Sequence, residues 1–187
     1  MLSPAFFKPF KRPLLLIIML GSYALPASAF VPSGYQQVAQ LHQVPGPYFY
    51  AIALNESGKK LTGRAVRPWP WTLNVAGKAY FYPTRNACYW ALMAVLKTGK
   101  QLVDIELMQV NWQYHHDKLH DPWQALDPYF NLQVGARIFR AEYDKTHNWF
   151  EAVGRYHSPG LKVGQKQRAL RYAERVFSRI ETLKGRT

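Results

Sequence analysis

Segment 84–99 constrains the fold most, because "TRNACYWALMAVLKTG" repeats apolar residues at helical spacing. A threonine able to cap a helix stands at its start, and a glycine able to end one stands at its close. The same spacing, bounded by proline, glycine or capping residues, predicts further helices over about 35–44, 47–58, 128–145, 147–156 and 163–183. A mainly α domain is therefore expected.

One segment has the pattern of a β-hairpin. In "RPWPWTLNVAGKAYFYP", over 67–83, alternating and β-branched residues flank a turn at 74–77. The segment 101–111, "QLVDIELMQVN", suits a strand by residue type, yet it is brief and carries two acids, so a loop or a helical turn fits equally well. The segment 112–128 is expected to be a polar, aromatic-rich loop. The prediction is one compact domain of the α+β kind with a small hairpin.

The first 29 residues have the pattern of a secretory signal peptide. Lys8, Lys11 and Arg12 precede the apolar run "PLLLIIMLGSYAL", and "ASA" at 27–29 supplies a small-residue cleavage site. The alternative is an uncleaved N-terminal anchor, although the apolar run is short for a membrane span. We expect export to the periplasm, with residues 30–187 forming the mature domain and no stable membrane insertion after cleavage.

The charge of the chain predicts an anionic partner. There are 24 Lys and Arg residues against 11 Asp and Glu residues, and the formal net charge is +13. Nucleic acid, acidic lipid and an anionic cell-wall polymer all fit this balance. Export and the absence of nucleic-acid-binding motifs disfavour nucleic acid. Cys88 is the one cysteine, which excludes an intramolecular disulfide, and we expect it to be a buried helix residue.

Glu56, in "ALNESG", is the one acidic residue before Asp104. If the second predicted helix ends near Gly58, Glu56 lies in its last turn, where backbone carbonyls concentrate negative partial charge. That position and apolar neighbours on the same face favour the protonated carboxyl, as a general acid requires. The positive charges of Lys59 and Lys60 favour the ionised carboxylate instead. An ordinary solvated helix end is the alternative.

Four segments in order resemble a known family. "ALNESG", "IELMQVN", "NLQVGARIF" and "AVGRYHSPG" are similar to the motifs of the goose-type, lysozyme-like lytic transglycosylases, of the single-domain kind associated with conjugation and secretion machines. The family pattern has a catalytic Glu-Ser on a helix, a "GLMQ" segment, an "N…G" helix and a closing tyrosine motif. The resemblance covers about residues 35–160 and implies a lysozyme-like fold.

The resemblance also implies roles for particular residues. Glu56 is expected to be the catalytic acid and base, and Ser57 to position it or the N-acetyl group of the sugar. Substrate-binding roles are expected for Met108, Gln109, Asn111 and Tyr156. The implied reaction cleaves the bond between N-acetylmuramic acid and N-acetylglucosamine in peptidoglycan with closure of a 1,6-anhydro ring. Neither a metal nor another cofactor is implied, and the use would be local wall opening for a conjugation or secretion machine.

Two positions depart from the family pattern. Glu106 replaces the glycine of "GLMQ", and His157 follows the tyrosine where the family has asparagine. A hydrolase that uses Asp104 or Glu106 as a second carboxylate is therefore one alternative. A domain that binds peptidoglycan without cutting it is another. Glu106 is expected to point away from the cleft.

The segment "HHDKLHD", 115–121, imitates the His-x-x-x-His spacing of a zinc protease helix, with Asp117 where such a helix has glutamate. Pro122 follows at once, so a solvated or glycan-facing loop is preferred. Aromatic residues make up 15% of the chain. Trp112 and Tyr114, beside the Met-Gln segment, are the best candidates for stacking on sugars.

Overall fold

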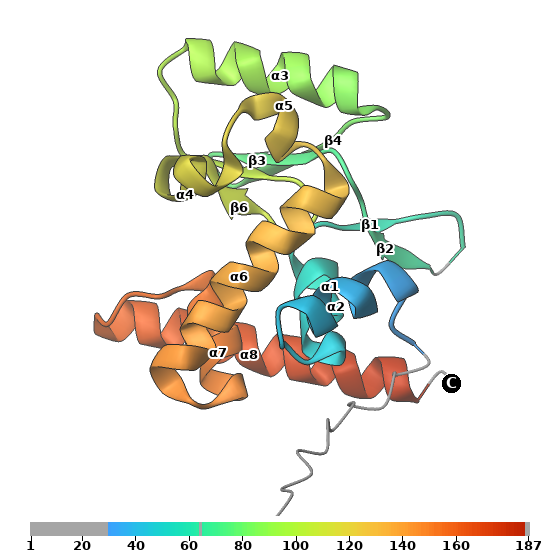
Figure 1. The fold of residues 1–187 in the computed structure, drawn as a ribbon, viewed down its shortest axis with the longest axis vertical. Helices are drawn as coiled ribbons and strands as arrows, with labels where there is room; N and C mark the ends of the chain where they lie inside the picture. The colour runs from blue at the N-terminus through green and yellow to red at the C-terminus, as the bar shows by residue number, and fades with distance from the viewer. Residues whose placement is uncertain (1–29, 64, 186–187) are drawn as a thin grey trace, which may run out of the picture.

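The computed structural model describes residues 30–63 and 65–185, so the predicted signal peptide lies outside the described residues. Over these described residues, eight helices and six short strands form a mainly α fold of the α+β kind, as the sequence predicts. Figure 1 shows two parts, with α1, α2, α7 and α8 below and α3, α4, α5 and a sheet above, joined by the long helix α6. Among the described residues, no helix has the length and apolar character of a membrane span.

The lower part is built around α2 (Gly46–Glu56). Phe49, Ile52 and Ala53 are fully buried, and this helix has no extended polar face because it packs against both α1 (Ser33–Leu41) and α8 (Val163–Lys184). A helix buried on most sides can hold its last side chain at a fixed position inside the molecule. That last residue is Glu56.

Side-chain caps set where several helices begin. Thr84 accepts a hydrogen bond from the amide of Ala87 at the start of α3 (Arg85–Lys97), as predicted. Asp127 caps α6 (Pro128–Thr146), and Asn148 caps α7 (Trp149–His157). Cys88 is fully buried in α3, which confirms its predicted place.

The predicted hairpin is formed by β3 (Thr72–Val75) and β4 (Lys78–Phe81). Ala76 and Gly77, with φ of 53° and 80°, connect the strands with the left-handed geometry that two-residue hairpins favour. The sheet also includes β5 (Val103–Ile105) and β6 (Val110–Asn111), in the antiparallel order β4-β3-β5-β6. A second hairpin, β1 (Gly58–Lys60) with β2 (Val66–Pro68), directly follows α2.

The segment 112–128 is not the predicted loop. It forms α4 (Trp112–Leu119), with a kink at His115, and the short α5 (Pro122–Ala125). Asn111 caps α4, and Asp121 caps α5 with two bonds of 2.8 and 3.0 Å, to the amides of Trp123 and Gln124. These caps compensate for a polar composition that shows no clear helical period.

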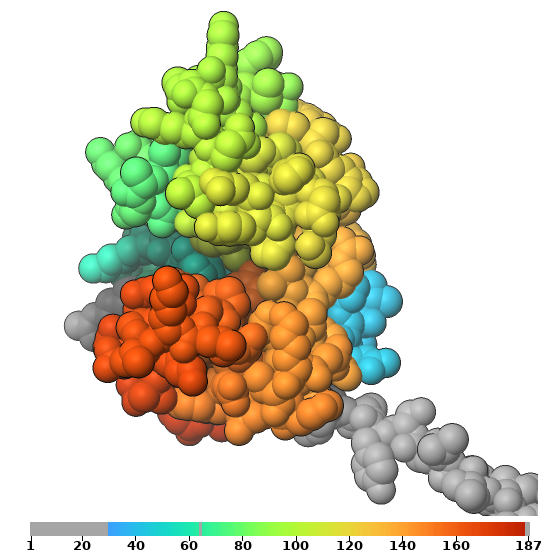
Figure 2. All heavy atoms as spheres, turned by 90° about the vertical axis from the view of Figure 1, so that its left-hand side faces the viewer, coloured from blue at the N-terminus to red at the C-terminus, as the bar shows by residue number. Residues whose placement is uncertain are grey.

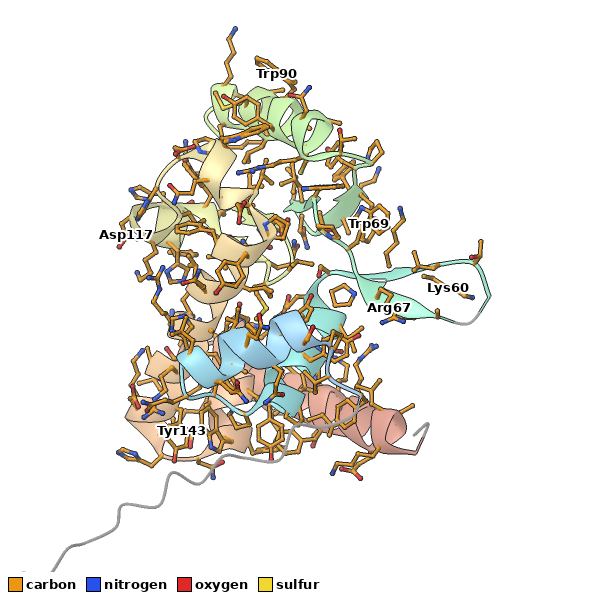
Figure 3. The ribbon with its side chains drawn as sticks, turned by 45° about the vertical axis from the view of Figure 1, so that its right-hand side comes forward. Lys60, Arg67, Trp69, Trp90, Asp117 and Tyr143 are labelled. Atoms are coloured by element: carbon orange, nitrogen blue, oxygen red, sulfur yellow. The ribbon has the colours of Figure 1, made fainter. Side chains whose placement is uncertain are left out.

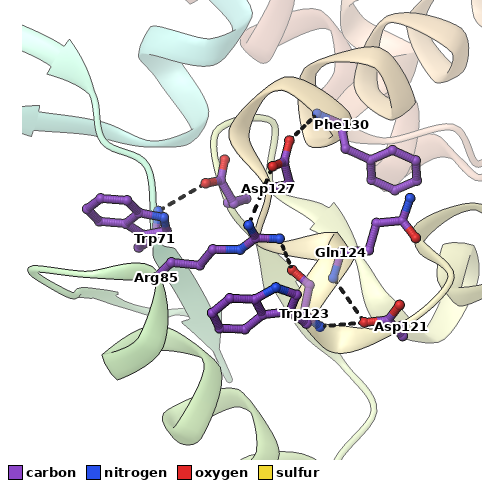
Figure 4. A network of polar contacts seen from close by, with 8 residues as sticks. Trp71, Arg85, Asp121, Trp123, Gln124, Asp127 and Phe130 are labelled. Carbon is purple, nitrogen blue, oxygen red and sulfur yellow. Dashed lines mark hydrogen bonds and ion pairs between the residues drawn. The ribbon is translucent and has the colours of Figure 1, made fainter.

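A polar network joins the helices of the upper part (Figure 4). Arg85 donates a 2.6 Å hydrogen bond to the carbonyl of Trp123 and forms a 3.5 Å ion pair with Asp127. Its guanidinium also lies over the Trp123 ring, 4.3 Å from the centroid. The start of α3 is thereby fixed to the residues that begin α5 and α6, and the sheet lies between α3 and the lower part (Figure 1).

Candidate active site

Glu56, the predicted catalytic residue, is the last residue of α2, so it lies at a helix end as expected. Its side chain is 15% exposed. The Oε1 atom is buried, forms no hydrogen bond with a described residue, and lies 3.7 Å from Nδ1 of His157. A sheltered carboxyl oxygen without a donor is uncommon, because buried polar atoms are nearly always hydrogen-bonded.

Glu56 faces a cavity of about 600 Å³ between the two parts of the molecule. Figure 2 shows the hollow between the yellow segment around 104–115 and the orange segment around 156–165. The lining includes four predicted site residues, Glu56, Gln109, Asn111 and Tyr156. They come from α2, the β5–β6 region and α7, so the fold brings together three segments that are distant in the sequence.

Tyr156 forms part of the cavity wall. Its hydroxyl donates a 2.7 Å hydrogen bond to the carbonyl of Met108, and its ring packs edge-on against Phe139. Burial raises the pKa of Tyr156, and the charges of Glu56 and Asp104 add to the effect. The Tyr156 hydroxyl therefore lies in the electrostatic environment of both carboxyl groups.

Ser57 and Met108 do not line the cavity. The Ser57 hydroxyl is buried and bonds the carbonyl of Leu107 at 2.7 Å, which ties the end of α2 to the β5–β6 loop. The Met108 side chain is fully buried and lies close to Gly135. Ser57 thus holds the segment that carries Glu56, and Met108 fixes the loop that carries Gln109.

Glu106 points away from the cavity, as predicted. It is fully buried, and its carboxyl oxygens accept hydrogen bonds from the amides of Leu107 at 2.7 Å and Trp71 at 3.2 Å. Its φ of 69° lies in the left-handed region that favours glycine. The backbone at 106 therefore explains why a glycine suits this position, and the glutamate here provides two acceptors for otherwise unpaired amides.

Asp104 is the second carboxyl group of the cavity. Burial raises its pKa and the charge of Glu56 acts in the same direction, whereas a 2.7 Å hydrogen bond from Asn111 and the nearby His157 lower it. The sequence offers Asp104 and Glu106 as candidates for a second carboxylate. Asp104 lines the cavity, whereas Glu106 does not. Asn111, predicted to bind substrate, also holds Asp104 in place.

Tyr172 is a site residue that the sequence reasoning missed. It lies on α8, and its buried hydroxyl interacts with the carboxyl group of Glu56. Burial first, and the charge of Glu56 next, raise its pKa. The ring of His157 stacks on it at 4.4 Å with an interplanar angle of 4°. The apolar period of α8 indicates burial of Tyr172, but no local signal connects it with a glutamate 116 positions earlier.

The other candidate residues from the sequence lie on α4 or directly after its end. Tyr114 is 67% exposed and lines the cavity, whereas Trp112 is half-buried and packs against the core. His116 and Asp117 lie on α4, and His120 follows its end with φ of 64°. In the described part of the chain, no cluster of three or more His, Cys, Asp or Glu residues has the arrangement of a metal site.

The cavity therefore combines one sheltered carboxyl group with an unpaired oxygen, a second carboxyl, two tyrosines and several amides. Such a set can donate and accept a proton and bind a hydroxyl-rich polymer by hydrogen bonds and ring stacking. No protein-family model, curated protein or solved structure matches this chain.

Proposed function

We propose that this protein is a peptidoglycan lytic transglycosylase, exported to open the wall locally for a conjugation or secretion machine. The observation that carries the proposal is the unpaired Oε1 of Glu56, buried at a helix C-terminus and facing a cavity of about 600 Å³. A carboxyl oxygen in that state has an unused hydrogen-bonding capacity next to the cavity. The order of motifs in the sequence supplies the substrate class.

In the proposed reaction the protonated carboxyl of Glu56 donates its proton to the glycosidic oxygen between N-acetylmuramic acid and N-acetylglucosamine. The C1–O bond breaks, and the substrate N-acetyl group stabilises the positive charge that develops at C1. The Glu56 carboxylate then removes the proton from the C6 hydroxyl, whose oxygen bonds to C1 and closes the 1,6-anhydro ring. The nucleophile belongs to the substrate and is already positioned, so the protein needs no second carboxylate.

The groups around Glu56 support this sequence of steps. Tyr156 and Tyr172 carry hydroxyl groups in the electrostatic environment of the carboxyl, and His157 lies 3.7 Å from Oε1. Polar groups fixed before the reaction can stabilise the charge that forms during it. Gln109 and Asn111 supply amides to the cavity, and Tyr114 exposes a ring to it.

The test is mass spectrometry of the products released from purified sacculi. Wild type is expected to release anhydro-muropeptides, and Glu56→Gln, which keeps the shape but cannot donate the proton, is expected to lose at least about a hundredfold in rate. Glu181→Gln, the same substitution at an exposed position that does not line the cavity, serves as the control. Equal product formation by Glu56→Gln and wild type would refute the proposal, and no release by either would favour a non-catalytic binding domain.

One observation favours a second candidate, a muramidase-type hydrolase. Asp104 lines the same cavity as Glu56, and two carboxyl groups facing one glycosidic bond are the usual requirement for hydrolysis. Asp104→Asn keeps the oxygen that accepts the bond from Asn111. A lytic transglycosylase is expected to keep forming anhydro products with this substitution. A hydrolase would lose its activity and would release reducing ends in the wild type.

A further inference from the structure

A second pocket, of about 540 Å³, lies beside the end of α2 and between β2 and α8. Asn55 lines this pocket, whereas the next residue, Glu56, lines the cavity described above. Arg175 and Arg179, one helical turn apart on α8, both line the second pocket, together with Glu174. Two adjacent residues at the end of α2 therefore line the second pocket and the cavity, respectively.

The pocket is mainly positive. Neither Arg175 nor Arg179 forms an ion pair with a described residue. The guanidinium of Arg175 lies 5.5 Å from the centroid of the Tyr172 ring. Figure 3 shows Lys60 and Arg67 on the β1–β2 hairpin, which projects from the body and whose strand β2 lines the pocket through Val66. Two unpaired guanidinium groups suit carboxylates, which they can bind with paired hydrogen bonds.

We propose that this pocket binds the acidic stem peptide carried by the muramic acid residues of the glycan strand. The proposal rests on the proposed function and names the part of the substrate that the second pocket recognises. Such a stem carries several carboxylates and, in many cell walls, one side-chain ammonium group. Arg175 and Arg179 match the carboxylates, and the carboxylate of Glu174 matches the ammonium group. Asn55, Ser178 and Thr182 provide polar groups for the peptide backbone.

The spacing along α8 agrees with this assignment. Tyr172 lies against Glu56, and Arg175 and Arg179 follow it by three and seven residues. At 1.5 Å per residue these positions are about 5 and 11 Å along the helix from Tyr172. An extended peptide covers about 3.3 Å per residue, so a stem of three residues spans about 10 Å. The length of such a stem thus matches the separation of the two arginines from Tyr172 along the helix.

The experiment measures binding of a synthetic, fluorescein-labelled stem peptide with free carboxylates to the full-length mature protein by fluorescence anisotropy. The variant Arg175→Gln/Arg179→Gln is compared with Arg168→Gln/Arg171→Gln, which removes the same charge from exposed positions of α8 that line neither pocket. We expect the first variant to bind at least about tenfold more weakly than wild type and the second to bind within about twofold. Amidation of the peptide carboxylates is expected to weaken binding to wild type by a similar factor.

Equal weakening in both double variants would overturn the inference, because it would indicate general attraction to a basic protein. Absence of peptide binding to wild type would also overturn it, and would leave an acidic partner protein as the occupant of the pocket. Because this readout does not depend on cleavage, it is separate from the release of anhydro products. If sacculi yield anhydro products while the peptide does not bind, the stem-peptide inference fails and the proposed function stands.

Discussion

Replacing Glu106 by glutamine tests the energetic cost of its buried carboxyl. The side chain is fully buried, and burial raises its pKa from 4.5 to about 8 despite two amide donors that act in the opposite direction. Between these values the folded protein keeps the proton that the unfolded chain releases. A group whose pKa is raised by folding in this way lowers stability as the pH increases from 4.5 towards 8.

The expected magnitude follows from the shift. Over pH 5 to 8 this carboxyl is expected to remove about 3 to 4 kcal/mol from the free energy of unfolding of wild type, and none from that of Glu106→Gln. For a domain of this size the loss corresponds to roughly 6–16 °C in Tm. Glutamine cannot accept a hydrogen bond through its NH2 group, so the variant also carries a constant cost of about 1 kcal/mol.

The assay is urea unfolding followed by tryptophan fluorescence at pH 5, 6, 7 and 8. The free energy of unfolding of Glu106→Gln is expected to rise steadily relative to wild type over this range. Glu181→Gln, at an exposed position, is the control and should follow wild type at every pH. A difference between Glu106→Gln and wild type that stays constant within about 1 kcal/mol from pH 5 to 8 would refute the reasoning.

Two further substitutions separate catalysis from packing. Tyr172→Phe removes a buried hydroxyl that interacts with the Glu56 carboxyl, so we expect the free energy of unfolding in urea to change by no more than about 1 kcal/mol, while turnover of sacculi falls about tenfold or more; unchanged turnover would remove Tyr172 from the mechanism. Gly135→Ala places a Cβ 2.6 Å from the Cγ of buried Met108 and is expected to cost about 1–3 kcal/mol of stability in urea unfolding. Gly34→Ala, where a Cβ meets nothing within 4 Å, is its control, and equal stability of the two variants would contradict the packing argument.

The predictable parts of the fold are those whose signals are local. Helix α3 has its threonine cap and terminal glycine in the sequence, and its observed bounds lie within the predicted segment. The β3–β4 hairpin follows from the small residues at its turn. Asp121 and Pro122 also have the pattern of a helix start, and this signal would have identified α5 if the polar composition had not been interpreted as a loop.

The remaining features depend on contacts between distant segments. Strand β5 forms because Leu73 and Ile105 pair across the sheet, and no local pattern indicates this pairing. Alternation along a strand would place Asp104 and Glu106 on the same face, but Glu106 follows the end of β5 with a φ of 69°, and its side chain is buried in the interior whereas Asp104 lines the cavity. Tyr172 reaches Glu56 through the packing of α8 on α2, which a single sequence cannot specify.

The burial of Cys88 has a practical consequence. The side chain is fully buried in α3, and burial raises the pKa of its thiol, so thiol reagents should leave it unmodified in the folded protein. A cysteine introduced at Leu161, which is 70% exposed and follows Gly160 at the rim of the cavity, then becomes the single site for labelling. An environment-sensitive dye at that position would report entry of a glycan strand directly, without removal of the natural cysteine.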